Sequence, residues 1–422
     1  MATLTRSDVP EDLRPSGLTR SSDRVGGDPG KRMLAMEGLR GLAILLVFVC
    51  HFQIVVAAKI APAFDSTSAR LITQIGGTGV DLFFLLSGFL IYRTALRPDL
   101  QIGAFLVRRV QRIYPTFLVV FAAYLALASR VAGGRIPSSP VATTEYVLLN
   151  VLLLPGVVDV PALLSAAWSL SYEISFYLLL PITVRALRLT TWPWRWRCVL
   201  FAGAAAGHLL LAYTRPEIFP AYRHYDGAFV RSVMFVSGMI LYELLASGRA
   251  GWRSPRWLQA GLVVGGAAAF SRFVALEDRT IGTVLHESIP HNALRAAYLF
   301  CVYTCLALTA LSPDGLLRRP FCGVVLRWTG NVSYSFYLIH GLVLNAIAVV
   351  ALRLPWVRAH PFLSAGVLLP TALAATAGVA YALYVTVEYP LSLRPQELRS
   401  ARPRPAVRNE PGLLRPADGV VT

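Results

Sequence analysis

Residues 36–51 read MEGLRGLAILLVFVCH, an apolar run with Arg40 near its start and His51 at its end. Apolar stretches of similar length recur along almost the whole chain, and a membrane-spanning helix needs roughly 20 predominantly apolar residues. The chain is 55% hydrophobic and 15% charged, whereas soluble domains carry about 25% charged residues. The sequence therefore predicts an all-α integral membrane protein.

The number of spans depends on one ambiguous segment. Apolar runs lie at 34–58, 76–96, 113–132, 145–165, 167–187, 198–213, 229–247, 257–275, 294–311, 332–352 and 364–388. The run at 145–165 contains Pro155, Asp159 and Pro161, and proline interrupts the hydrogen bonds of a helix. We predict a bundle of about ten transmembrane helices, with a re-entrant or interfacial segment near 145–165.

Basic residues indicate how the bundle is oriented. The formal net charge is +17, and of the 40 basic residues 38 are Arg. With ten spans, 28 of the 40 fall on one side, and cytosolic loops are the ones enriched in Lys and Arg. We predict a multi-pass protein of the bacterial inner membrane with both termini in the cytosol. Because the charges lie between apolar runs, we interpret them as an orientation signal and expect no nucleic-acid partner.

The domain plan follows from the same pattern. Residues 1–32 and 391–422 are polar, rich in Arg and Pro, and typical of disordered tails. We expect both tails to be cytosolic and residues 33–390 to form one transmembrane domain. The five cysteines form no CxxC pair, so we predict small apolar core residues and no metal site.

Ionisable residues inside the first span are candidates for function, because a charge at bilayer depth is costly. Arg40 and His51 are eleven residues apart, which is three helical turns plus about 20°, so they share one face. They are separated by about 16 Å along the axis. Glu37 lies one turn before Arg40 on that face. The alternative reading is an interfacial Arg–Glu pair and a hydrogen-bonded core histidine.

Two further charged motifs follow. Asp81 comes after a glycine-rich entry to the second span, where it can orient a histidine or form a structural pair. Arg109 and Arg112 are one turn apart and follow Arg108. A guanidinium group donates two parallel hydrogen bonds, which suits phosphate. The alternative for this cluster is ordinary basic flanking of a span.

Two later helices carry one-sided polar stripes. The first repeats every four residues and the second every three: Ser169, Glu173 and Tyr177, then Tyr334, Tyr337 and His340. Residues at such spacings share a helix face, so each stripe predicts a row of pocket residues. Interhelical hydrogen bonds that hold the bundle together are an equally good reading.

Six motifs in order together resemble the acyltransferase-3 family of membrane O-acyltransferases. The matching pieces are Glu37-Gly38-Leu39-Arg40-Gly41 with His51, Gly79-Val80-Asp81-Leu82-Phe83-Phe84 with Ser87-Gly88-Phe89, Arg109-x-x-Arg112-Ile113-x-Pro115, Trp168-Ser169-Leu170-x-x-Glu173-x-x-Phe176-Tyr177, Gly330-x-x-Ser333-Tyr334-x-x-Tyr337-Leu338-x-His340, and Glu388-x-Pro390. They run from about residue 33 to 390. One departure is Glu37, where the family often has Asp.

The resemblance implies about ten helices and an acyl-CoA donor, acetyl-CoA in the first place, used as a co-substrate with no other cofactor. It implies catalytic roles for Arg40 and His51, with Glu173 beside them. It implies donor binding by the arginines at 108, 109 and 112 together with Tyr177. The remaining candidates would line the substrate pocket: Glu37, Asp81, Ser169, Tyr334, Tyr337 and His340. The compact form, without a fused esterase-like domain, resembles members that acylate antibiotic sugars or macrolide hydroxyls.

The chemistry expected from this resemblance leaves two routes open. His51 can act as a general base toward the acceptor hydroxyl, or it can carry the acyl group transiently. A secondary transporter or exporter of a polar metabolite is the alternative function, because transporters also carry intramembrane ionisable residues. Transporters often show paired inverted halves with broken helices, and the sequence shows no such pairing.

Overall fold

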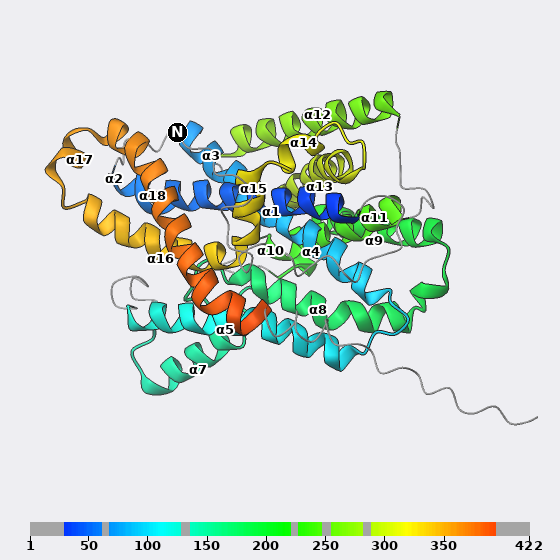
Figure 1. The fold of residues 1–422 in the computed structure, drawn as a ribbon, viewed down its shortest axis with the longest axis horizontal. Coiled ribbons are helices and arrows are strands. Elements are labelled where there is room, and N and C mark those ends of the chain that lie inside the picture. The colour runs from blue at the N-terminus through cyan, green and yellow to red at the C-terminus, as the bar shows by residue number, and fades with distance from the viewer. Residues whose placement is uncertain are drawn as a thin grey trace, which may run out of the picture.

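The computed structural model describes residues 29–60, 67–127, 136–220, 227–246, 255–281 and 288–393, and these are almost entirely helical. Within these ranges the backbone forms no strand, apart from one isolated bridge between Pro155 and Val158. Figure 1 shows α1 (Pro29–Phe52) crossing the middle of the molecule, with α12 (Arg256–Thr280) on one side and α5 (Ile102–Ala126) and α8 (Trp168–Ala186) on the other.

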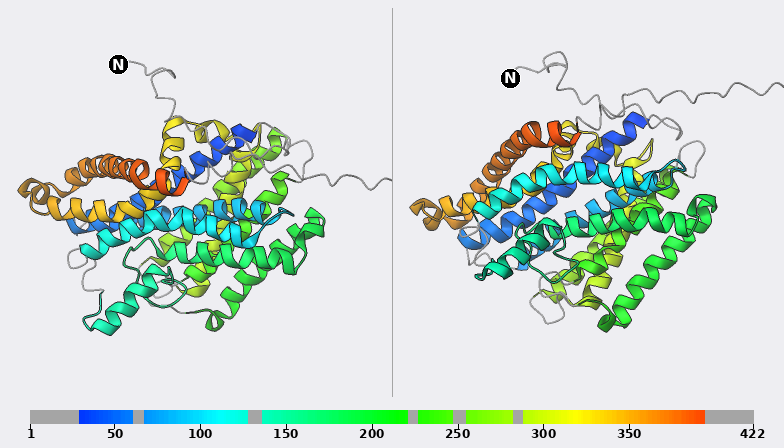
Figure 2. Two further views of the ribbon diagram at one scale, coloured as in Figure 1. Left: turned by 60° about the horizontal axis from the view of Figure 1, so that its bottom comes forward. Right: turned by 90° about the horizontal axis from the view of Figure 1, so that it is seen from below.

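The other helices complete the bundle (Figures 1 and 2). The longer ones are α3 (Thr67–Gly77), α4 (Gly79–Ala95), α7 (Pro140–Val151), α9 (Trp194–Thr214), α11 (Val233–Ala246), α13 (Ile289–Leu311), α15 (Val324–Asn331), α16 (Ser333–Ala351) and α18 (Pro361–Leu383). The short ones are α2 (Ala58–Ile60), η4 (Leu189–Thr191), η5 (Pro216–Ile218), α10 (Ala228–Arg231), α14 (Arg318–Phe321) and α17 (Pro355–Ala359). Two π-helical segments are η2 (Gln53–Ala57) and η6 (Tyr384–Leu393).

The helices confirm an all-α integral membrane protein. Among the described residues, eight helical segments are long and apolar enough to cross a membrane: Leu34–Ile60, Thr67–Ala95, Trp194–Thr214, Ala228–Ala246, Arg256–Thr280, Ile289–Leu311, Ser333–Ala351 and Pro361–Leu393. The long helices α5 and α8 lie beside them, with 25 and 19 residues. These ten segments correspond to the ten spans expected from the sequence.

The ambiguous run at 145–165 does not form a long helix. Helix α7 ends at Val151, and the chain continues without helix to the start of α8 at Trp168. Leu153 and Gly156 adopt positive φ angles of 54° and 93°, a backbone region that most side chains avoid. In Figure 1, α7 lies at the edge of the bundle, beside α5.

Close helix packing depends on glycine where α1 meets α15. A Cβ atom at Gly330 would collide with the backbone carbonyl of Glu37, and one at Gly41 would collide with that of Leu326. Small residues let helix backbones approach closely in membranes. This contact fixes the position of the turn of α1 that carries Arg40.

Both π-helical segments contain or adjoin an ionisable side chain. The segment η2 begins two residues after His51, and η6 contains Glu388, which is 0% exposed. Single-turn π segments inside helices occur frequently at functional sites, because the extra residue changes where the following side chains point. The two segments therefore mark His51 and Glu388 as candidate functional residues.

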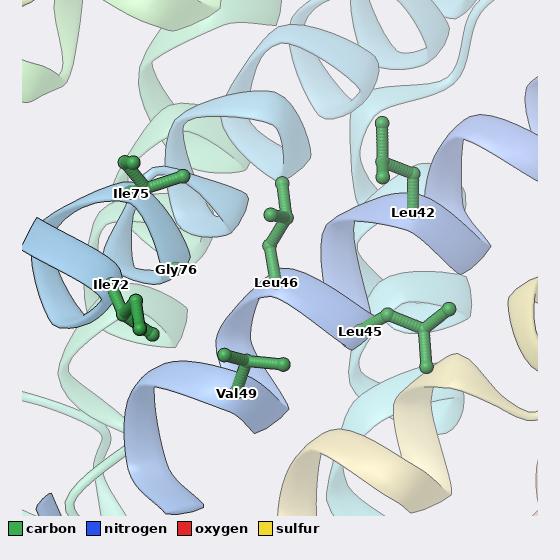
Figure 3. Close-up of a pocket in the computed structure, with 7 residues that line it drawn as sticks. All are labelled: Leu42, Leu45, Leu46, Val49, Ile72, Ile75 and Gly76. Atoms are coloured by element: carbon green, nitrogen blue, oxygen red, sulfur yellow. The ribbon is translucent and has the colours of Figure 1, made fainter. Parts of the chain in front are cut away.

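An apolar pocket of about 220 Å³ lies between α1 and α3 (Figure 3). Its lining consists of Leu42, Leu45, Leu46, Val49, Ile72, Ile75 and Gly76. At about 100° per residue, the α1 residues in this lining point roughly 140–240° away from Arg40. The pocket therefore belongs to the outer, apolar face of α1 and not to the face that carries Arg40 and His51.

The ends of the transmembrane domain differ slightly from the expected boundaries. Helix α1 begins at Pro29, four residues before the predicted start, and η6 continues to Leu393. The remaining parts of the two predicted tails, 1–28 and 394–422, lie outside the described residues.

Candidate active site

One end of the site is built around the ion pair of Arg112 and Glu388, whose Nη1 and Oε1 atoms are 2.7 Å apart. Glu388 Oε2 also accepts hydrogen bonds from the backbone N–H (3.1 Å) and the hydroxyl (2.5 Å) of Ser335. The Arg112 guanidinium lies over the ring of Tyr334, 5.7 Å from its centroid, and the Tyr334 hydroxyl donates to the Ile113 carbonyl. Helices α5, α16 and η6 are thereby tied together.

Arg109 lies one turn before Arg112 and is held by aromatic rings. Its guanidinium carbon lies 5.2 Å from the ring centroid of Phe105 and 5.4 Å from that of Tyr177. Its Nε atom is buried and makes no hydrogen bond with any described residue. Arg108 is exposed on the surface of α5. Arg109 therefore faces the interior of the bundle, with donor capacity left for a ligand.

Arg40 lies at the centre of this end of the site. Its electrostatic neighbours are Arg112 from α5, Glu173 and Tyr177 from α8, and Glu388 from η6. Within the described part of the chain, no side chain or carbonyl forms a hydrogen bond or ion pair with its guanidinium. Since a guanidinium carries five N–H donors, Arg40 is a partly buried cation with donors available to an anionic ligand.

Glu173 links this end to the middle of the bundle. Its Oε1 atom accepts a hydrogen bond from the Ser87 hydroxyl at 2.7 Å and a second from the Tyr177 hydroxyl. The polar stripe on α8 thus makes interhelical hydrogen bonds, one of the two roles expected for it: Tyr177 lies beside Arg109, and Ser169, two turns earlier, faces Tyr337 on α16. The Ser169 and Tyr337 hydroxyl oxygens are 2.7 Å apart.

The opposite end of the site holds His51 and His340, whose ring centroids are 4.7 Å apart at an interplanar angle of 73°. The Nδ1 atom of each faces a carbonyl oxygen, that of Val47 at 2.9 Å and that of Tyr337 at 2.6 Å. A carbonyl only accepts, so Nδ1 carries the hydrogen and Nε2 of the neutral ring is an acceptor. His340 Nε2 is buried without a hydrogen-bond partner in the described residues.

Asp81 forms a buried structural pair rather than a contact with a histidine. Its carboxylate receives two parallel hydrogen bonds from Arg231, Nε to Oδ1 at 2.9 Å and Nη2 to Oδ2 at 2.8 Å. Arg231 also donates to the Gly77 carbonyl and lies over the ring of Trp168. Of the two roles expected for Asp81, the structure shows pairing.

Glu37 is likewise paired, but its partner is not Arg40. The Glu37 carboxylate accepts from Arg327 Nε on α15 at 3.0 Å. The expected continuous line of Glu37, Arg40 and His51 is therefore interrupted, because Glu37 turns toward α15 while Arg40 faces α5 and α8. Glu37 belongs to the α1–α15 contact, next to the close approach at Gly330.

Three side chains at the site were absent from the candidates drawn from the sequence: Arg231, Arg327 and Glu388. Arg231 lies at the edge of the apolar run 229–247, and Arg327 lies between two apolar runs, so both were counted only among the basic residues that orient the bundle. The rule that ionisable residues inside spans are functional candidates would have found Arg231. Glu388 was recognised within a motif, and only the fold shows that it reaches Arg112.

Sequence comparisons show the family of the chain. The profile of the acyltransferase-3 family, described as an acyltransferase domain, matches residues 33–387. Acyltransferase MdmB of Streptomyces mycarofaciens is 28% identical over 91% of this chain and 98% of its own length. Exopolysaccharide production protein ExoZ of Rhizobium meliloti is 26% identical over 66% of the chain and 80% of its own length. Peptidoglycan O-acetyltransferase OatA of Listeria monocytogenes is 25% identical over 74% of the chain and 49% of its own length.

No solved structure matches the chain. The family match covers the described bundle from α1 into η6 and includes both histidines and the arginines of the site. The chain belongs to the acyltransferase-3 family and is a membrane-embedded acyltransferase.

Proposed function

We propose that this protein transfers an acyl group, acetyl in the first place, from acyl-CoA to a hydroxyl of a sugar, glycan or macrolide-type acceptor. The observation that supports it most directly is a polar column through the bundle. The column begins at Arg109 and Arg112, continues through Arg40 and Glu173, and ends at His51 and His340.

The arginine end suits a polyanionic donor. Arg109 has a buried Nε without a partner, and the guanidinium of Arg40 has none among the described residues. Guanidinium groups bind phosphate through paired hydrogen bonds, so the phosphates of CoA would dock here, with Arg108 at the entrance. We infer from the excess of basic residues that this side faces the cytosol and that the membrane is a bacterial inner membrane, with both termini on the same side.

His51 is positioned to act as the base. With Nδ1 donating to the Val47 carbonyl, the lone pair of Nε2 is available to a hydroxyl proton. Nε2 would take that proton as the hydroxyl oxygen forms a bond to the thioester carbonyl carbon. The carbon–sulfur bond then breaks, and the departing CoA thiolate recovers the proton from His51. General acid–base catalysis of this kind contributes typically ~10²–10⁴-fold.

Arg40 belongs to the donor end in this scheme. It lies about 16 Å from His51 along α1. At that distance it cannot stabilise the negative charge that forms on the thioester carbonyl oxygen when the acceptor hydroxyl attacks next to His51. Its role is therefore to hold the donor, and Glu173 fixes the surrounding hydroxyls of Ser87 and Tyr177. A transient acyl group on His51 is the competing route.

The test uses purified protein in lipid nanodiscs with acetyl-CoA labelled in the acetyl group. The acceptors are a glycosylated macrolide, a methyl glycoside of its sugar, a soluble oligosaccharide and a disaccharide muropeptide. We expect CoA release that depends on one of these acceptors and label that appears in it as an ester. Acceptor movement across proteoliposomes without CoA release would instead identify a transporter. Label on His51 after rapid quenching without acceptor would select the covalent route.

A further inference from the structure

We propose that a neutral, hydroxyl-bearing acceptor enters the site at the His51–His340 end, and that the non-helical segment 152–167 forms the wall of its binding site. This inference rests on the proposed acyl transfer from CoA. It adds the location of the acceptor site, the residues at its mouth and the charge class of the acceptor.

The segment lies at the end of the column opposite the arginines. Helix α5 carries Arg112 near its middle and Tyr124 near its end, and twelve helical residues span about 18 Å. A Cβ atom at Gly341, next to His340, would touch the Tyr124 hydroxyl and would lie 3.9 Å from the Ser165 hydroxyl. Tyr124, Ser165 and His340 are therefore neighbours, at the far end from the donor site.

Specific side chains hold the segment in place. Asn150 at the end of α7 accepts from the Leu163 backbone N–H at 2.8 Å and donates to the Pro161 carbonyl at 3.3 Å. The Tyr172 hydroxyl on α8 donates to the Gly156 carbonyl at 2.6 Å. The backbone of this segment lies outside any helix. These side-chain hydrogen bonds hold both halves of the segment in a defined conformation.

Its last residues contact the active-site column directly. The Ala166 carbonyl accepts hydrogen bonds from the hydroxyls of Tyr337 (2.7 Å) and Ser169 (3.2 Å). The Tyr337 ring lies 5.8 Å from that of His340. Non-helical backbone at membrane depth occurs only where it is buried in protein or lines a water-filled cavity. Here it is placed against the residues that would receive the acceptor.

The charges at this end favour an uncharged acceptor. Arg231 and Asp81 neutralise each other in a bidentate pair, and each histidine directs Nδ1 at a backbone carbonyl, which leaves Nε2 of the neutral ring as an acceptor. Arg295 lies near this pair and is itself 3.7 Å from the carboxylate of Glu277, so its charge is also balanced. The polar groups next to His340 are hydroxyls such as those of Ser169 and Tyr337. The donor end, by contrast, gathers several arginines around Glu173 and Glu388. This difference in charge assigns the polyanionic CoA to the arginine end and a neutral, hydroxyl-bearing acceptor to the His51–His340 end.

Two side chains mark the mouth of this site. Ser165 is exposed, although its hydroxyl lies near Gly341. Trp168, three residues later, is partly exposed, with the Arg231 guanidinium over its ring. A pocket that combines aromatic surface with a few placed polar groups is typical of small-molecule sites. A bulky side chain at 165 would narrow the entrance without touching the arginines.

The first test is the Ser165→Trp variant, assayed in nanodiscs with labelled acetyl-CoA and two acceptors, a glycosylated macrolide and the methyl glycoside of its sugar. We expect kcat/KM for the macrolide to fall at least tenfold relative to that for the small glycoside, with the KM for acetyl-CoA unchanged. The control Val141→Trp changes a residue on α7 that is 80% exposed, and it should behave as the wild type. An equal change for both acceptors, no change, or a raised acetyl-CoA KM would overturn the proposal.

The second test does not depend on activity, so it separates this inference from the proposed reaction. Ser165→Cys and Arg97→Cys each introduce a thiol, the latter at a 52% exposed side chain in the turn before α5. In sealed vesicles, a membrane-impermeant maleimide should label the two variants from opposite faces, above the wild-type background of native cysteines. Labelling of both from one face, or no labelling at 165, would refute the proposed entrance. A wild type that transfers no acetyl group, with labelling as expected, would refute the reaction alone.

Discussion

The imidazole rings of His51 and His340 meet edge to face, with centroids 4.7 Å apart. One ring comes from the first span and the other from α16, 289 residues later in the chain. Each ring donates its Nδ1 hydrogen to a carbonyl of its own helix, so two Nε2 acceptors occupy the same end of the polar column. In the neutral form of each ring, Nε2 is therefore the nitrogen that can accept a proton.

Replacing His51 with alanine should remove the base and leave the fold intact. We expect kcat for acetyl transfer to fall by ~10²–10⁴-fold, with the protein level in membranes unchanged. The control is His360→Ala, because His360 also faces the carbonyl four residues earlier but is exposed. Near-normal turnover by His51→Ala would exclude His51 as the catalyst.

Replacing Arg109 with glutamine should weaken donor binding. The variant side chain is shorter and loses the charge over Phe105 and Tyr177, so we expect the KM for acetyl-CoA to rise about tenfold or more, which corresponds to ~1.4 kcal/mol. The acceptor KM should not change. Arg97→Gln, an exposed arginine paired with Asp99, is the control, and equal effects in the two variants would contradict a specific donor site.

The Gly330→Ala variant should separate α1 from α15. Its Cβ would collide with the Glu37 carbonyl, and overpacking of this kind costs typically about 1–3 kcal/mol. We expect a lower unfolding temperature in detergent and reduced activity, because the collision moves the turn that carries Arg40. Gly366→Ala places a methyl group where no atom lies within 4 Å. It should leave stability unchanged or slightly raised, and a similar loss there would rule out the packing explanation.

The Asp81→Asn variant should destabilise the protein more than it impairs chemistry. It removes the carboxylate charge that balances the largely buried Arg231, and removing one member of a buried ion pair costs about 3–5 kcal/mol. We expect a large drop in thermal stability, measured by size-exclusion chromatography after heating. The double variant Asp81→Leu, Arg231→Met should recover part of it. A stable but inactive Asp81→Asn protein would point to a role in catalysis instead.

The candidate site was predictable from sequence where it depends on one helix. The helical repeat of 3.6 residues per turn is enough to put Arg40 and His51 on one face of α1. It likewise aligns Ser169, Glu173 and Tyr177 on α8, and puts Arg109 and Arg112 one turn apart on α5. The partners on other helices were not predictable. Asp81 pairs with Arg231 across 150 residues, and Glu37 pairs with Arg327 across 290. Helical periodicity fixes the direction of a side chain but does not specify which helix lies opposite.

The sequence by itself determined that this chain forms a helical membrane protein of the acyltransferase-3 family, because hydropathy and motif order are properties of the chain alone. It also determined which residues share a helix face. Only the tertiary structure decided that Glu37 turns to Arg327 while Arg40 keeps its donors free, and that His51 meets His340 beside segment 152–167. The reason is physical: buried polar groups require partners, and which partners they find depends on how the helices pack.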